Sequence, residues 1–202
     1  MWLSSPPWDS VVYWSLDLET GGLEPGTDAI LAVGMVPIRA GTARLAEAYY
    51  TLVRPEPGAR IDPRSVTAHQ LVEAELRDAP ALAEVVPEIA RRAAEGVLLV
   101  HHRALDLGFL KRAFGAAGVR WPAPPVVDTV NLLVAVERRR RMRDPYLPEK
   151  LPPLNLSIAR RGLGLPDYPA HDALSDALAT AELFLALRTR LGARTVRDVR
   201  RA

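Results

Sequence analysis

Near its start the chain carries the run Val11-Val12-Tyr13-Trp14-Ser15-Leu16-Asp17-Leu18-Glu19-Thr20-Gly21-Gly22. An apolar run that ends at a glycine turn is typical of a buried strand. Residues two apart on a strand point to the same face, so Asp17 and Glu19 are expected roughly 7 Å apart at the strand end. Two like charges at this distance are unfavourable unless a cation lies between them, and a divalent metal ion is the usual one. The run therefore predicts half of a metal site.

Two later segments offer the carboxylates that a complete site needs. Asp106 follows the apolar run 97–101 and opens an amphipathic stretch. Asp176 lies in the strongly helical segment 171–182, and His171 precedes it by five residues. Strand ends and helix starts gather active-site groups in α/β proteins. Taken singly, each acidic residue is also compatible with a helix-capping or solvent-facing role, but their joint occurrence indicates a site.

Hydrophobic periodicity predicts five strands and five clear helices. The strands are expected near residues 11–17, 29–39, 44–53, 96–101 and 125–128. The helices are expected at residues 80–95, 104–117, 128–142, 154–162 and 172–191. Three early strands followed by alternating helices and strands indicate an α/β fold with a mixed sheet. The proline-rich residues 144–153 are expected to form a rigid loop rather than a domain linker.

The composition fits one domain. With 202 residues, 49% of them hydrophobic, the chain is long enough to bury one good core. We expect a single domain over residues 1–202, with its core at about 11–191 and short extensions at both ends. No Cys is present, so any metal ion must be held by carboxylate or imidazole groups, which favours Mg²⁺ or Mn²⁺. No apolar stretch approaches a membrane span and residues 1–7 do not resemble a signal peptide, so a cytoplasmic protein is expected.

Positive charge is unevenly distributed along the chain. The net charge is only +2, but one arginine run occupies residues 138–143, Arg160 and Arg161 form another, and more arginines follow Arg188. Such runs contact phosphates in nucleic-acid enzymes, and salt-dependent binding would follow. The alternative is a solvated helix face. The sequence leaves both open for residues 138–143 and favours the solvated face for the C-terminal tail.

The acidic residues occur in the order of a known set of motifs. Three segments of the chain resemble the three motifs of the DEDDh family of 3′-to-5′ exonucleases. They are Asp17-Leu18-Glu19, Asp106 within residues 101–106, and His171 with Asp176. This is the superfamily of the proofreading epsilon subunit of bacterial DNA polymerase III, and the resemblance spans roughly residues 11 to 190. The stretches 66–71 and 78–80 resemble the family's segment between the third strand and the second motif.

The resemblance implies both a fold and an activity. The implied fold is ribonuclease H-like, a mixed five-stranded sheet flanked by helices. The implied activity is hydrolysis at single-stranded or frayed DNA 3′ ends, with release of nucleoside 5′-monophosphates and two Mg²⁺ or Mn²⁺ ions per active site. The implied metal ligands are Asp17, Glu19, Asp106 and Asp176, with Asp17 as the bridging ligand. The implied substrate contacts are Thr20, Gly21 and Leu23, and His102 is a further candidate for substrate binding.

The residue types suit this chemistry. Four carboxylates can hold two metal ions about 3.5 to 4 Å apart, one activating a water and the other stabilising the departing 3′ oxygen. His171 is expected to accept the proton of that water, because imidazole exchanges protons near neutral pH. Glycine in the turn at Gly21 lets the backbone approach the terminal nucleotide, and Leu23 is expected to pack on a base.

The second motif departs from the family pattern. The family usually has His-Asn and then Phe before its Asp, whereas this chain has His101, His102 and Leu105. The usual Asn contact to the substrate is therefore in doubt, and His102 is the candidate donor in its place. Two other functions stay open: a 3′-5′ exoribonuclease acting on short RNA or RNA 3′ ends, and a non-catalytic nucleic-acid-binding relative. The contacts to a 2′-hydroxyl that would separate RNA from DNA cannot be located, and association with a DNA polymerase cannot be inferred.

Overall fold

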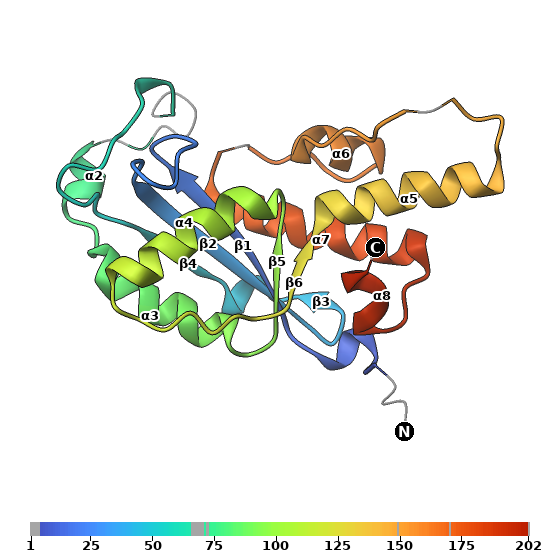
Figure 1. Ribbon diagram of the computed structural model, residues 1–202, viewed down its shortest axis with the longest axis horizontal. Helices are drawn as coiled ribbons and strands as arrows, with labels where there is room; N and C mark the ends of the chain where they lie inside the picture. The colour runs from blue at the N-terminus through green and yellow to red at the C-terminus, as the bar shows by residue number, and fades with distance from the viewer. Residues whose placement is uncertain (1–4, 66–70, 72, 149, 170, 202) are drawn as a thin grey trace.

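The centre of the molecule is a mixed β-sheet (Figure 1). The computed structural model describes residues 5–65, 71, 73–148, 150–169 and 171–201. Within these residues the sheet has six strands: β1 (Tyr13–Thr20), β2 (Ile30–Arg39), β3 (Thr42–Ala43), β4 (Tyr49–Leu52), β5 (Val97–Val100) and β6 (Val126–Asp128). The strand order is β3-β2-β1-β5-β6, and β4 also pairs with β2. β1 is antiparallel to β2 and parallel to β5, so its carboxyl end meets that of β5 at one edge of the sheet.

Helices cover both faces of this sheet. The described helices are α2 (Glu73–Arg77), α3 (Leu82–Ala93), α4 (Arg103–Ala116), α5 (Thr129–Arg143), α6 (Leu156–Gly162), α7 (Ala173–Leu191) and α8 (Val196–Arg200), with 3-10 turns η1 (Trp8–Ser10) and η2 (Leu45–Glu47). Figure 1 shows α3 and α4 on one face and α7 on the other, with α5 running alongside α7. Among the described residues, no helix has the length and apolar character needed to cross a membrane.

Alternate residues of β1 pack into two hydrophobic cores. Trp14 and Leu16 are buried with residues of α3 and α4, whereas Tyr13 is buried with residues of α5, α7 and α8. Because side chains on a strand alternate between faces, Asp17 and Glu19 lie on the same face as Tyr13. The pattern of β1 therefore directs both carboxylates toward α7.

The helix that meets them is defined at both ends. Asp172 precedes α7, and its side chain accepts a hydrogen bond from the backbone N–H of Ser175, which caps the first turn. Gly192 ends the helix with a φ of 60°, a left-handed conformation that glycine adopts without steric cost. The predicted helix at 172–191 is confirmed to within one residue.

The sheet differs from the expectation in one strand. The mixed α/β arrangement is confirmed, but the strand expected at 44–53 is found only as β4, and β3 adds a sixth strand. The reason is the turn at Ala40 and Gly41, which have φ values of 47° and 75° and reverse the chain early. Glu47 then lies in the turn η2, where it forms an ion pair with Arg39 at 2.7 Å. Residues 66–70 of the family-like stretch 66–71 lie outside the described residues.

Candidate metal centre and active site

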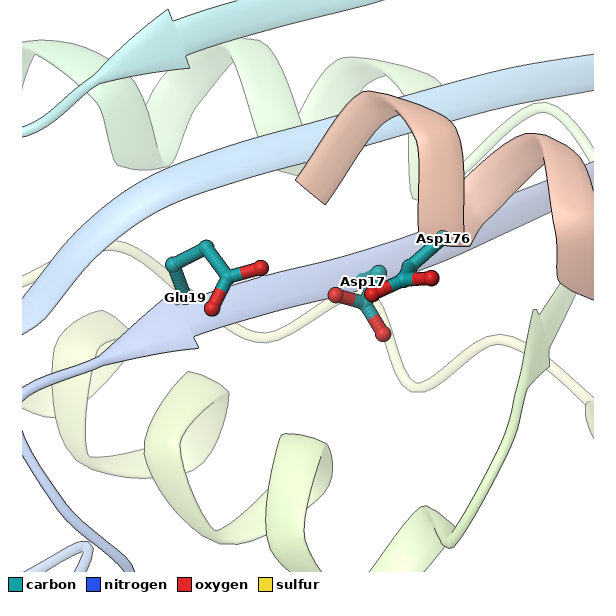
Figure 2. Close-up of side chains that lie close together, drawn as sticks. All are labelled: Asp17, Glu19 and Asp176. Atoms are coloured by element: carbon teal, nitrogen blue, oxygen red, sulfur yellow. The ribbon is translucent and has the colours of Figure 1, made fainter. Parts of the chain in front are cut away.

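Three carboxylates meet between the end of β1 and the start of α7 (Figure 2). Asp17 and Glu19 come from β1 and Asp176 from the first turn of α7, and one oxygen of each lies within 4.8 Å of the others. Figure 2 shows Asp176 reaching down to Asp17, with Glu19 further along the strand. Glu19 is buried, whereas Asp17 and Asp176 are half-buried. The three oxygens are thus close enough to share one cation.

The turn after β1 is fixed by hydrogen bonds. The hydroxyl of Thr20 donates to the carbonyl of Gly22 at 2.6 Å, and the N–H of Gly21 donates to the carbonyl of Ala29 at 2.8 Å. The fully buried Asp28 packs against Gly22, where an added Cβ would overlap its carboxylate. Glycine is therefore required at this turn for packing, and the turn holds the end of β1 in place.

Gly34 of β2 allows α7 to approach the sheet. This residue pairs with Asp17 in the register of β1 and β2. A Cβ at Gly34 would overlap the backbone carbonyl of Ala173 and would come within 2.6 Å of the nitrogen of Leu174. The first turn of α7 thus rests on the sheet at the one position beside Asp17 that lacks a side chain, and this contact brings Asp176 to the site.

The four acidic residues expected from the sequence all have raised pKa values. Burial raises the pKa of Asp17, and the charges of Asp106, then Asp176 and Glu19, raise it further. Burial and then the charge of Asp176 raise the pKa of Glu19 to about 7. Burial and then the charge of Asp128 raise the pKa of Asp106 to about 8. A divalent cation offsets both the free-energy cost of burying these charges and the repulsion between them. Oxygen ligands are the ones that Mg²⁺ and Mn²⁺ prefer. The residues present fit such an ion.

Asp106 lies beside the group of three without being part of it. It is in the first turn of α4 and 6% exposed. Its oxygens are not within the 4.8 Å that joins the other three carboxylates. Its charge is nevertheless the strongest of those that raise the pKa of Asp17. Asp106 is therefore a neighbour of Asp17 outside the group of three.

His171 lines a cavity next to the carboxylates. The cavity has a volume of about 540 Å³, and Glu19, Thr20 and Leu23 line it together with His171. The backbone N–H of His171 donates to Oδ2 of Asp176 at 3.0 Å, and its φ is 66°. Thr20 and Leu23, both expected to contact substrate, are thus brought together with the expected base, whereas Gly21 is not among the lining residues.

His102 has a different environment from the one expected. Its Nε2 lies 3.0 Å from the carbonyl oxygen of Leu154, and Nε2 of His101 lies 2.7 Å from the same oxygen. A carbonyl only accepts, so both Nε2 atoms donate, and Nδ1 of His101 lies 2.7 Å from the hydroxyl oxygen of Thr129. Burial also lowers the pKa of His101. The two imidazoles hold the segment before α6, and a substrate contact by His102 stays a prediction.

Asp128 is a site residue that the sequence reasoning missed. Its carboxylate accepts from the backbone N–H groups of His102 (3.2 Å), Arg103 (3.0 Å) and Val130 (3.0 Å). It therefore joins the N-termini of α4 and α5, and its charge contributes to the raised pKa of Asp106. Its position at the end of a predicted strand was the available signal.

The sequence grouped Arg160 with Arg161 as a short arginine run, of the kind that either contacts phosphates or forms a solvated helix face, and the structure instead buries Arg160. Its side chain is only 2% exposed and donates to the carbonyl of Ala179 and to Glu182, both on α7. Its neighbour Arg161 is exposed and pairs with Asp167. A buried cation needs partners, and here the structure supplies them from α7 and the loop before it.

Comparison with known proteins identifies the family. A family model described as exonuclease matches residues 15–184. The DNA polymerase III subunit epsilon-like protein of Rhodobacter capsulatus is 35% identical over 193 residues, 95% of this chain and 26% of that protein. A putative bifunctional exonuclease/endonuclease protein of Mycobacterium tuberculosis is 34% identical over 183 residues, 88% of this chain and 26% of that protein. The crystal structure of E. coli exonuclease I with a dA16 oligonucleotide shares the fold, with a TM-score of 0.75 and 19% identity over 90% of this chain and 42% of that one.

The chain belongs to the exonuclease family. The family predicted from the motifs is therefore confirmed, as is the ribonuclease H-like arrangement of a mixed sheet between helices. Exonucleases of this family depend on divalent metal ions, which agrees with the cluster of oxygen ligands. The chain spans about a quarter of the length of the first two relatives, 26% in each case.

We predict that Gly34→Ala disrupts the metal centre. The added methyl group displaces the first turn of α7, so affinity for Mg²⁺ should fall by about tenfold or more, as for other changes in the support of metal ligands. Isothermal titration calorimetry of the metal-free protein measures this. Gly115→Ala is the matched control, because a Cβ there meets nothing within 4 Å. Equal affinities for the two variants would contradict the role assigned to Gly34.

The metal-free protein should lose stability as the pH rises. The pKa values of Glu19 and Asp106 in the folded chain, about 7 and about 8, lie above the values near 4 of unfolded carboxyls. Between about pH 4 and about pH 8 the folded state binds more protons than the unfolded state. The free energy of unfolding therefore falls as the pH rises and these protons leave. Melting curves in chelator from about pH 5 to about pH 8 should show a falling Tm. Glu19→Gln should reduce the dependence of Tm on pH. A Tm that rises over the same pH range would contradict the repulsion assigned to these carboxylates.

Proposed function

We propose that the chain is a metal-dependent 3′-to-5′ exonuclease domain that acts on DNA 3′ ends and releases nucleoside 5′-monophosphates. The observation that carries this proposal is the group formed by Asp17, Glu19 and Asp176, whose oxygens lie within 4.8 Å of one another. Asp106 is the fourth carboxylate that we assign to the same centre. We treat residues 1–202 as one exonuclease domain, with a cytoplasmic location.

The four carboxylates would hold Mg²⁺ or Mn²⁺, two ions per site. Bound ions of this kind lower the pKa of a water and stabilise the oxygen that leaves in an in-line displacement. The carboxylates themselves fix the position of the centre at the end of β1. His171 would accept the proton of the attacking water at a ring nitrogen, since its backbone is tied to Asp176 while its side chain lines the neighbouring cavity.

The cavity beside Glu19 would take the terminal nucleotide. Leu23 is 74% exposed, so its side chain is free to pack on a base. Thr20 lines the same cavity, and Gly21 lets the backbone of the turn approach the substrate. Arg60 also lines the cavity and offers positive charge to a phosphate. His102 would contact the substrate through Nδ1, the ring nitrogen that does not face Leu154.

DNA is the substrate that we favour. Relatives of this chain are named as an epsilon-like subunit of DNA polymerase III and as DNA polymerase III of PolC type, and E. coli exonuclease I has been solved with DNA oligonucleotides. The alternative, an exoribonuclease for short RNA or RNA 3′ ends, differs only in contacts to the 2′-hydroxyl. Association with a DNA polymerase, in proofreading or repair, is a further proposal that rests on these names alone.

One experiment tests the class and ranks the substrates. Single-stranded DNA, mismatched duplex DNA and short RNA, each labelled at the 3′ or the 5′ end, are digested side by side with Mg²⁺, Mn²⁺, Ca²⁺ or chelator. Release of mononucleotides from 3′ ends with Mg²⁺ or Mn²⁺, little with Ca²⁺ and none in chelator is the expected result. Full activity in chelator, or products from 5′ ends, would overturn the proposal. Faster digestion of RNA would favour the alternative.

Substitution of single carboxylates should separate ligands from neighbours. Asp17→Asn and Asp176→Asn should each abolish turnover but leave the metal-free fold as stable or more stable, because each removes repulsion. Asp172→Asn is the matched control on the same helix, since an amide oxygen still caps α7 and turnover should persist. Turnover and Tm are measured for all three variants. An Asp172→Asn protein as inactive as Asp176→Asn would show that the ligand on α7 is misassigned.

Replacement of the proposed base should affect rate and not metal binding. His171→Ala should lower kcat by roughly 10² to 10⁴ while affinity for Mn²⁺ stays unchanged. The reason is that its backbone N–H, which holds Asp176, survives the substitution. Single-turnover kinetics at saturating Mn²⁺ and calorimetry of the same protein give the two quantities. If activity returns simply by raising the metal concentration, His171 positions the metal ligand and is no base.

A further inference from the structure

A buried cation anchors the loop that carries His171. Arg160 lies near the end of α6, is 2% exposed, and reaches both the loop before α7 and α7 itself. Its Nη1 donates to the carbonyl of Ala179 at 2.6 Å. Its Nη2 donates to the carbonyl of Pro166 at 2.9 Å and to Oε2 of Glu182 at 2.7 Å. One guanidinium therefore joins the loop to two successive turns of the helix.

Tyr168 closes this arrangement into a network. Its ring lies under the guanidinium of Arg160, 4.7 Å from the centroid to Cζ. Its hydroxyl donates to Oε1 of Glu182 at 2.9 Å, so the two oxygens of that carboxylate bind Arg160 and Tyr168 respectively. We call Arg160, Tyr168 and Glu182 the Arg160 network. Each of the three contacts the other two.

The network and the metal centre hold the same short segment at its two ends. Pro166 and Tyr168 are bound by the network, and three residues further on the N–H of His171 is bound by Asp176. Asp176 and Glu182 lie on α7, six residues apart. The imidazole of His171 makes no side-chain hydrogen bond among the described residues, so its position depends on how its backbone is held.

Burying a charged anchor costs free energy, and the arginine offers a geometric advantage in return. Burial of an arginine is unfavourable without matched partners, and apolar residues can hold a loop at least as firmly. The planar guanidinium instead fixes directions, because its donors form a rigid fork. Here the fork sets the loop relative to Ala179 and Glu182, and so relative to the helix that carries Asp176.

We propose that the Arg160 network is a positioning device for His171, setting where its imidazole lies in the cavity beside the carboxylate cluster. This inference rests on the proposed function, in which His171 accepts a proton. None of the three residues touches the substrate or the metal in this proposal. Each acts through the backbone of the loop.

A double-mutant cycle with Tyr168→Phe tests the proposal. This change removes one hydroxyl and keeps the ring, so the protein should still fold. We expect kcat to fall about five- to tenfold with KM and affinity for Mn²⁺ unchanged, because the base is misplaced. In a His171→Ala background the same change should have no further effect on kcat, since no base remains to be positioned. Equal losses in both backgrounds would make the network a general structural element and overturn the proposal.

A second measurement does not depend on nuclease activity. Hydrogen exchange of the His171 amide reports how firmly the loop is held. Tyr168→Phe should speed this exchange, whereas the matched control Tyr146→Phe, whose side chain is 97% exposed on another loop, should not. Unchanged exchange in Tyr168→Phe overturns the proposal even if the protein is a nuclease. Faster exchange in a protein without nuclease activity would leave the anchor in place and refute only the proposed function.

Discussion

The remainder of the fold has to overcome the repulsion between the carboxylates held near the end of β1. Asp17 and Glu19 on one strand and Asp176 on α7 are brought within 4.8 Å by contacts that do not involve their charges. The force that holds them is the packing of α7 against β1 and β2, which buries aromatic and aliphatic residues such as Tyr13 and Phe184. Apolar burial far from the site therefore balances the electrostatic cost at the site.

Hydrogen-bond partners set Asp128 and Asp172 apart from Asp17. Asp128 accepts three backbone N–H groups, and Asp172 caps α7. Backbone donors at helix starts stabilise negative charge there. Asp17, at the centre of the cluster, accepts from no such donor among the described residues, and burial with neighbouring charges raises its pKa. A carboxylate that faces other carboxylates is neutralised by a proton or by a cation, which is a physical criterion independent of motif.

The sequence predicted the elements better than their contacts. The apolar alternation in β1 and the capped, periodic segment of α7 are local signals, so both elements and the faces of Asp17 and Asp176 could be foreseen. The close approach at Gly34 could not, because it depends on a helix that begins about 140 residues later in the chain. The position of His102 was missed for the same reason: its partner is the carbonyl of Leu154, 52 residues away.

Arg160 and Arg161 show how little composition says about the use of a charge. The two are adjacent in α6, yet successive residues of a helix point about 100° apart. Arg160 therefore faces α7, where it donates to Glu182 and to the carbonyl of Ala179, and it also donates to Pro166 in the loop before α7. Arg161 faces solvent and pairs with Asp167. A count of arginines treats both as candidates for phosphate. Burial assigns one of them to the framework that carries His171, so the positive charge available to a nucleic acid is smaller than the sequence suggests.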